Sequence, residues 1–287
     1  MKKSILLRRN ANRKHWVGDG FFVSTMIHPT PELYPHTSPF VLLDYAEPKH
    51  FAPREQPYGI GEHPHRGFET VTFAYQGEVS HRDSGGGGGT IEQGDVQWMT
   101  AGSGVVHEEF FSKNFTQKGG MMEMVQLWVN LPKKDKMTFP QYQGAKDESF
   151  PRVNVGEAAV ARLIAGTFQN QKGPCTTFSP IKVFDLTIKE KSVVSFDLEE
   201  QTNTLILVLR GKGRIFEEEV LEKELLVLSQ EGRTIEVSSD HEMKLLVLNG
   251  QPIDEPIAAH GPFVMNTQEE IMQAIDDFTQ GKMGRLS

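Results

Sequence analysis

The chain has 287 residues, of which 38% are hydrophobic and 24% are charged, and its formal net charge is -8. This composition is typical of a soluble globular protein, and the length accommodates one large or two ordinary domains. Acidic and basic residues are spread along the chain, whereas a surface that coats DNA or RNA normally shows a dense basic stripe. Nucleic acid is therefore not expected as a direct ligand.

The single cysteine, Cys175, excludes an intramolecular disulfide, as expected for a protein of the reducing cytoplasm. We interpret it as a small packed residue beside Pro174 rather than a catalytic thiol. The segment Ser4–Leu7 is too short for the apolar core of a signal peptide, and no stretch approaches the roughly 18 apolar residues of a membrane span. The sequence thus predicts a cytoplasmic protein without membrane contact, and we expect a monomer.

The first half of the chain reads as a series of short strands. Prolines punctuate the loop between the first two strands, and prolines at that density oppose helix. Runs rich in β-branched and aromatic residues indicate strands at 21–26, 40–45, 68–75, 78–83, 96–100, 105–111 and 122–131. The polar segment 132–136 ends this series.

Five consecutive glycines, Gly85–Gly89, follow the predicted strand 78–83. A phosphate-binding interpretation would require a helix after the glycines, and usually a Lys-Ser or Lys-Thr pair. Another strand and turn, 90–95, follows instead. The run is therefore predicted to be a flexible connection at the mouth of a barrel.

The second half shows the same rhythm and then changes period at its end. Strands are predicted at 159–165, 181–186, 192–198, 204–209, 213–217, 225–228, 234–237 and 244–248. Apolar residues then recur at helical spacing after Thr267 and Glu270, which form a capping-box start, and Gly281 is a plausible stop. We expect an all-β protein with an N-terminal barrel at 1–140 and a C-terminal barrel at 141–287 that ends in this helix.

Three histidines and one glutamate carry the strongest chemical signal. Residues two apart on a strand point to the same side, so His63 and His65 share one face, and His107 and Glu109 share a face of another strand. Glu108 points the other way. If the two faces meet, three imidazoles and one carboxylate converge into a metal site with open coordination positions. The second half has no matching pair, so we place metal chemistry in the first half only.

Long motifs in the chain resemble the pirin family of the cupin superfamily. They are His63-Pro64-His65-Arg66-Gly67-Phe68-Glu69-Thr70-Val71-Thr72, Gly94-Asp95-Val96-Gln97-Trp98-Met99-Thr100-Ala101-Gly102, Val106-His107-Glu108-Glu109 and Gly261-Pro262-Phe263-Val264-Met265-Asn266-Thr267. The resemblance implies a bicupin of two antiparallel β-barrels, or jelly rolls, with iron in the N-terminal barrel and none in the C-terminal one.

The resemblance also implies the ligand set His63, His65, His107 and Glu109. In ordinary cupins the carboxylate follows the histidine pair within one motif, which would nominate Glu69 instead. Alternation from His65 keeps Glu69 on the same face, so it remains a rival as a ligand or as a neighbour of the ligands. The set binds one divalent metal, and it accommodates manganese, cobalt, nickel, copper or zinc as well as the Fe(II) that the family implies.

Resemblance to bacterial pirins implies quercetin 2,3-dioxygenase activity, the opening of the central flavonol ring by dioxygen with release of carbon monoxide. Glu109, or a nearby acid such as Glu69, is the candidate base for the flavonol 3-hydroxyl. The alternative that the family suggests is a metal- or redox-dependent regulator that binds a transcription factor or a metabolic enzyme. A small aromatic, flavonol-like substrate and a protein partner are thus both candidate ligands, and metal-dependent isomerisation or decarboxylation would use the same residues.

Overall fold

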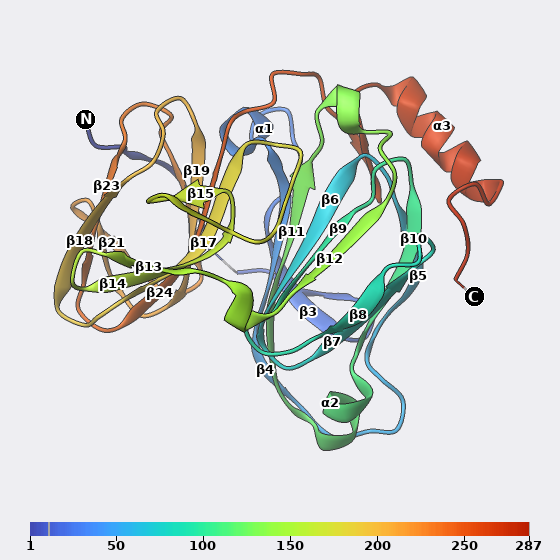
Figure 1. The fold of residues 1–287 in the computed structure, drawn as a ribbon, viewed down its shortest axis with the longest axis horizontal. Coiled ribbons are helices and arrows are strands. Elements are labelled where there is room, and N and C mark those ends of the chain that lie inside the picture. The colour runs from blue at the N-terminus through green and yellow to red at the C-terminus, as the bar shows by residue number, and fades with distance from the viewer. Residues whose placement is uncertain (11, 287) are drawn as a thin grey trace. The chain divides into compact units, whose positions relative to one another are not determined.

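The computed structural model describes residues 1–10 and 12–286, and most of them form β-strands. The chain forms two compact units. Unit 1 comprises Met1–Ala11, Thr30–Pro39 and Glu148–Pro252, and unit 2 comprises Asn12–Pro29, Phe40–Asp147 and Ile253–Ser287. Each unit contains one seven-stranded sheet and one four-stranded sheet, so the predicted all-β bicupin architecture is confirmed (Figure 1).

Unit 2 places its longest strands in the centre of a seven-stranded sheet. The order is β12-β9-β6-β11-β4-β3-β2, with β12 at Gln141–Ala145, β9 at Val96–Thr100, β6 at Phe68–Gln76, β11 at Gly120–Asn130, β4 at Phe40–Phe51, β3 at Phe21–Ile27 and β2 at His15–Val17. The four-stranded sheet has the order β5-β10-β7-β8, with β5 at Gly59–His65, β10 at Val105–Phe111, β7 at Val79–Asp83 and β8 at Gly88–Ile91.

Unit 1 repeats this plan. Its seven-stranded sheet has the order β1-β22-β19-β24-β17-β14-β13, with β1 at Ile5–Asn10, β22 at Glu224–Leu228, β19 at Asn203–Arg210, β24 at Met243–Gly250, β17 at Ile181–Ile188, β14 at Ala159–Ala165 and β13 at Arg152–Val155. Its four-stranded sheet has the order β18-β23-β20-β21, with β18 at Ser192–Asp197, β23 at Thr234–Ser239, β20 at Gly213–Ile215 and β21 at Glu218–Val220. By position in the four-stranded sheets, β18 and β23 are therefore the counterparts of β5 and β10.

Short elements complete the two units. They are the helices α1 at Tyr34–Thr37, α2 at Lys113–Lys118 and α3 at Gln268–Thr279, the 3-10 turns at Lys133–Asp135 and Asp147–Ser149, and the strand pairs β15 (Thr167–Phe168) with β16 (Gln171–Lys172) and β25 (Ala258–His260) with β26 (Phe263–Met265). No helix among residues 1–10 and 12–286 has both the length and the apolar character needed to cross a membrane.

The two ends of the chain do not follow the ranges 1–140 and 141–287 that the sequence suggested as domains. The N-terminal segment belongs to unit 1 with most of the second range, and the C-terminal segment belongs to unit 2 with most of the first range. The first strand, β1, pairs antiparallel with β22 at the edge of unit 1. The last helix, α3, belongs to unit 2, where its buried Ile271 and Ala274 pack with Val106 and Phe263. The partner of an edge strand and the docking site of a helix depend on the folded surface. Dividing the sequence into two consecutive ranges does not reveal either of them.

Helix α3 begins where the sequence predicted it. The Thr267 side chain accepts a hydrogen bond from the Glu270 backbone N–H at 3.2 Å. The Thr267 backbone N–H in turn donates to the Glu270 side chain, which completes the capping box. Gly281 follows the helix with a φ of 73°, a left-handed conformation that favours glycine.

Cys175 is buried and free, and burial raises the pKa of its thiol to about 12. A thiol with so high a pKa is a poor source of thiolate, which agrees with a packing role.

Candidate metal centre

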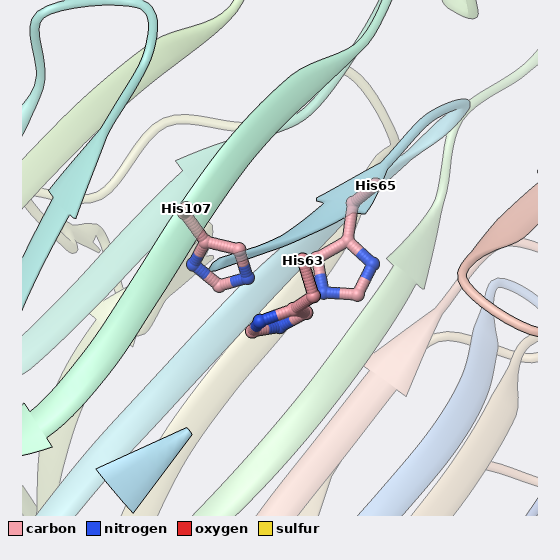
Figure 2. Close-up of side chains that lie close together, drawn as sticks. All are labelled: His63, His65 and His107. Atoms are coloured by element: carbon pink, nitrogen blue, oxygen red, sulfur yellow. The ribbon is translucent and has the colours of Figure 1, made fainter. Parts of the chain in front are cut away.

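Strands β5 and β10 bring three histidines together in unit 2. The antiparallel register sets His107 directly opposite His63, and His65 opposite Val105. The ring centroids of His63 and His107 are 4.2 Å apart, those of His65 and His107 4.8 Å, and those of His63 and His65 4.9 Å. Figure 2 shows the three imidazoles converging from these two strands. Their ligand atoms all lie within 4.8 Å of one another.

In the described part of the chain, His63 and His65 each make a ring hydrogen bond through Nδ1 and not through Nε2. The Nδ1 of His63 lies 2.8 Å from the carbonyl oxygen of Gly61, and the Nδ1 of His65 lies 3.3 Å from that of Pro262. A carbonyl only accepts, so both Nδ1 atoms carry the proton and both Nε2 atoms have a lone pair. The Nε2 atom of His107 is buried without a hydrogen-bond partner among residues 1–10 and 12–286. An orphaned buried nitrogen of this kind fits a metal ligand.

The electrostatics favour neutral imidazoles. Burial and the neighbouring His63 lower the pKa of His65 to about 3. Burial, together with the neighbouring His65 and His63, lowers the pKa of His107 well below its ordinary value. Only a neutral imidazole offers a lone pair to a metal. The donor atoms are therefore ready to bind a cation at neutral pH.

Glu109 lies next to this group, on the same strand as His107. Its Oε1 accepts hydrogen bonds from Gln97 Nε2 and, at 3.2 Å, from Thr72 Oγ1. Between His107 and Glu109 the pairing with β5 shifts from His63 to Ile60, because β5 carries an extra residue there. Glu108 faces the other way and pairs with Arg82 at 2.5 Å.

Glu69 lies on the far face of its strand. On β6, Phe68 stacks on Trp128 and touches the ring of His65, so the next residue points in the opposite direction. The buried Glu69 carboxylate accepts a hydrogen bond from Thr100 Oγ1 at 2.8 Å. Counting alternate residues from His65 does not give the correct face for Glu69, because the two residues lie on different strands. Strand β5 ends at His65, and a turn with Gly67 at a φ of 87° precedes β6. Glu69 is absent from the groups of clustered ligand atoms in the described chain.

Two residues that the sequence analysis did not select, His81 and Asp83, lie beside the histidine cluster. Their strand, β7, pairs with β10 so that His81 is opposite Glu109 and Asp83 is opposite His107. The ligand atoms of His81, His107 and Glu109 form a second compact group. The sequence did carry a signal, because His81 and Asp83 share one face of a predicted strand.

A cavity of about 160 Å³ opens onto the cluster. Its polar lining consists of His63, His65, Glu109, Gln126 and Asp44. Its apolar lining consists of Val17, Phe21, Val23, Leu42, Ile60, Met124 and Trp128. Burial raises the pKa of Asp44, which is a second carboxyl group in the cavity besides Glu109. The sequence analysis missed Asp44 because the residue lies in a strand with no partner motif.

The counterpart strands of unit 1 present apolar side chains instead. Val194 and Phe196 of β18 and Ile235 and Val237 of β23 are buried in the core of that unit. Aliphatic and aromatic groups offer no metal ligands, so the two units share a plan but differ in the chemistry of these two strands.

Two cupin barrels in one chain define a bicupin, and in this chain one barrel carries a cluster of histidines with a glutamate beside it. The Pirin family pattern matches residues 23–129, and the Pirin C-terminal cupin domain pattern matches residues 183–284. The chain is 49% identical over 286 residues to a Pseudomonas aeruginosa protein named "Putative quercetin 2,3-dioxygenase", covering 99% of each. It is 39% identical over 271 residues to a pirin-like protein of Solanum lycopersicum, covering 93% of this chain and 88% of that one.

A solved structure titled quercetin 2,3-dioxygenase from Acinetobacter baumannii superimposes with a TM-score of 0.95 at 47% identity, covering all of both chains. The chain belongs to the pirin family.

Proposed function

We propose that this chain is a metal-dependent dioxygenase of the quercetin 2,3-dioxygenase type, with one divalent iron held by His63, His65, His107 and Glu109. The printed names of the Pseudomonas and Acinetobacter relatives support the reaction class. The observation that carries the proposal is the convergence of the three imidazoles of His63, His65 and His107 beside a largely apolar cavity that His63, His65 and Glu109 line.

The chain's own residues supply binding, orientation and proton transfer. A divalent iron held by His63, His65, His107 and Glu109 would supply Lewis acidity toward an enolate oxygen and redox chemistry toward dioxygen. Among the described residues, Gln97 and Thr72 donate hydrogen bonds to Glu109, both to its Oε1, which leaves Oε2 for the metal or for a substrate proton. Asp44 lines the same cavity and takes the place of Glu69 as the alternative base.

The cavity volume limits how a flavonol enters. Sites that bury a drug-sized ligand measure roughly 300–1,000 Å³. At about 160 Å³, this cavity accepts one edge of such a molecule rather than the whole of it. We infer that the hydroxyl-bearing edge of the flavonol enters, while the remainder lies outside the cavity.

The test is to incubate iron-loaded protein with quercetin in air and to follow both the flavonol absorbance and the release of carbon monoxide. We expect loss of absorbance with stoichiometric carbon monoxide, and loss of both signals in His63→Ala. Glu69→Gln is the matched control, because this carboxylate lies on the far face of β6. No absorbance change with wild-type protein, or an equal change with His63→Ala, would exclude the enzymatic function.

The second candidate is a metal-dependent regulator that binds a protein partner. The small volume of the cavity favours it, since a regulator need not bury a substrate. A pull-down from the native host that retains a partner in only one oxidation state of the iron would support this function. Identical partner binding by iron-loaded protein and by His63→Ala would contradict it.

A further inference from the structure

A chain of hydrogen bonds runs from Asp83 through His81 to His107. His81 Nε2 lies 3.0 Å from Asp83 Oδ2, and His81 Nδ1 lies 3.3 Å from His107 Nδ1. All three side chains are buried, with 3% or less of the side chain exposed for His81 and Asp83 and none of residue His107. Water is therefore a poor competitor for these bonds.

The positions of the protons in this series of hydrogen bonds follow from Asp83, at one end of the series. A carboxylate only accepts hydrogen bonds, so the proton between Asp83 and His81 sits on His81 Nε2. In neutral His81 the Nδ1 atom is then an acceptor, which requires His107 to donate from its own Nδ1. His107 Nε2 consequently keeps its lone pair, and this is the atom without a hydrogen-bond partner in the described chain.

The glycine run holds the Asp83 carboxylate, at the start of this series of hydrogen bonds. Asp83 Oδ1 accepts hydrogen bonds from the backbone N–H groups of Gly85 at 2.8 Å and Gly87 at 3.0 Å. A Cβ on Gly87 would lie 2.4 Å from Tyr142 Cβ and 2.5 Å from Asp83 Oδ2, so no larger residue fits there. The run is not the flexible connection predicted from the sequence, because it folds into a turn around Asp83 and then into β8.

Tyr142 fixes the plane of the middle ring. Its ring stacks on His81 with centroids 4.9 Å apart and an interplanar angle of 19°. Its hydroxyl donates to Gln97 Oε1 at 3.3 Å, and the amide of the same Gln97 donates to Glu109. His107 is thus positioned by His81 of the neighbouring strand β7, and Glu109 by Gln97 of β9 in the seven-stranded sheet.

We infer that Asp83 and His81 are positioning residues that fix the tautomer of His107, and that the glycine run serves to hold Asp83. The inference rests on the proposed metal site, but not on flavonol turnover. Groups that orient a ligating histidine in this way typically contribute about 10–100-fold to metal affinity.

The first measurement is the ¹⁵N NMR spectrum of metal-free protein labelled at histidine, which distinguishes protonated from unprotonated ring nitrogens. We expect His107 to carry its proton on Nδ1 in the wild type. A proton on Nε2 of His107 would overturn the inference. This readout needs neither metal nor substrate, so it stands even if the protein does not act on flavonols.

The second measurement is the zinc affinity of variants, by competition with a chelator. We expect His81→Phe, which keeps the stack on Tyr142, to bind zinc about 10–100-fold more weakly than wild type. His81→Gln should recover part of that loss, because its amide oxygen can accept the proton of His107 Nδ1. Adding Asp83→Asn to His81→Phe should weaken binding no further, since the chain is already broken.

The glycine run is tested with a matched pair. A Cβ on Gly87 would lie within 2.5 Å of Asp83 Oδ2 and Tyr142 Cβ, whereas a Cβ on Gly89 would lie 3.4 Å from the Tyr142 hydroxyl and 3.9 Å from Tyr142 Cε1, at ordinary contact distance. Gly87→Ala should therefore weaken zinc binding, and Gly89→Ala should not.

Two results for His81→Phe would overturn the positioning role. One is a zinc affinity equal to that of wild type. The other is the loss of one nitrogen ligand from the metal, measured by X-ray absorption, which would make His81 a direct ligand.

Discussion

His63 and His107 face each other across the antiparallel pair β5–β10, with ring centroids 4.2 Å apart. This single cross-strand relationship joins the two halves of the histidine cluster, because His65 follows His63 by two residues and Glu109 follows His107 by two. The proposed metal site therefore depends on the register of one strand pair. A slip of β5 by one residue would turn His63 and His65 to the opposite face, away from His107.

The first prediction separates the two candidate carboxylate ligands. Glu109→Gln should lower metal affinity at least about tenfold, because it removes a charged donor beside His107. Glu69→Gln should leave metal affinity within about threefold of wild type, because Glu69 bonds to Thr100 on the far face of β6. Calorimetric titration with cobalt or zinc provides the comparison. A larger loss in Glu69→Gln than in Glu109→Gln would reverse the assignment.

The second prediction concerns the buried Asp44. Burial raises its pKa, so the folded state holds the proton more tightly than the unfolded state, and its contribution to stability is lost as pH rises through the folded pKa. Asp44→Asn keeps a neutral side chain of the same shape. The variant should therefore unfold at a higher temperature than wild type at neutral pH, and at about the same temperature near pH 3. Differential scanning calorimetry of metal-free protein measures both, and a lower unfolding temperature of the variant at neutral pH would contradict this.

The third prediction concerns Lys136, whose ammonium is buried in unit 2. Its Nζ donates to Gly67 O at 2.8 Å, to Asn130 Oδ1 at 2.7 Å and to Val264 O at 2.8 Å. Lys136→Met leaves these three acceptors without their donor. An unsatisfied buried group costs about 1–3 kcal/mol, so we expect the free energy of unfolding to fall by at least about 2 kcal/mol at pH 7. Urea denaturation measures this fall.

Lys136 also predicts a pH dependence. Burial lowers its pKa to about 7, although the carboxylates of Glu255 and Glu270 oppose this shift. Between pH 7 and the unfolded value of 10.5, the unfolded state binds more protons than the folded state, so the free energy of unfolding rises with pH. Lys136→Met should lack this rise. Parallel pH profiles of wild type and variant would show that the three hydrogen bonds keep the ammonium charged across the whole window.

The fourth prediction uses the size of the cavity. Leu42 is half-buried and lines the cavity, so Leu42→Ala enlarges it without touching a proposed ligand. We expect the KM for quercetin to fall in the variant while its metal content stays the same. Steady-state kinetics with quercetin measures the change. A higher KM would mean that Leu42 contacts the flavonol directly rather than restricting its entry.

Strand alternation predicted the histidine cluster well because the relevant pairs lie within single regular strands. His63 with His65, and His107 with Glu109, keep their common faces in the structure. Alternation misplaced Glu69 because the chain turns at Gly67, where the φ of 87° breaks the period. Strand alternation therefore predicts which side chains share a face only within a single strand.

Other features required the tertiary structure. The role of Asp83 depends on backbone N–H groups in the glycine run, and nothing in that run's composition shows which carboxylate it will surround. The pairing of β1 with β22 joins strands more than two hundred residues apart, and edge strands carry no local signature of their partner. The capping box of α3, by contrast, was predictable because both of its residues lie within one turn.

The most direct test of the proposed metal centre is the metal content of purified protein after loading with iron under anaerobic conditions and desalting. We predict one iron per chain for wild type and for His260→Ala, whose histidine is exposed on β25, and almost none for His107→Ala. Metal-free unfolding temperatures of the same samples verify that each variant is folded. Retention of a full equivalent of iron by folded His107→Ala would contradict the account.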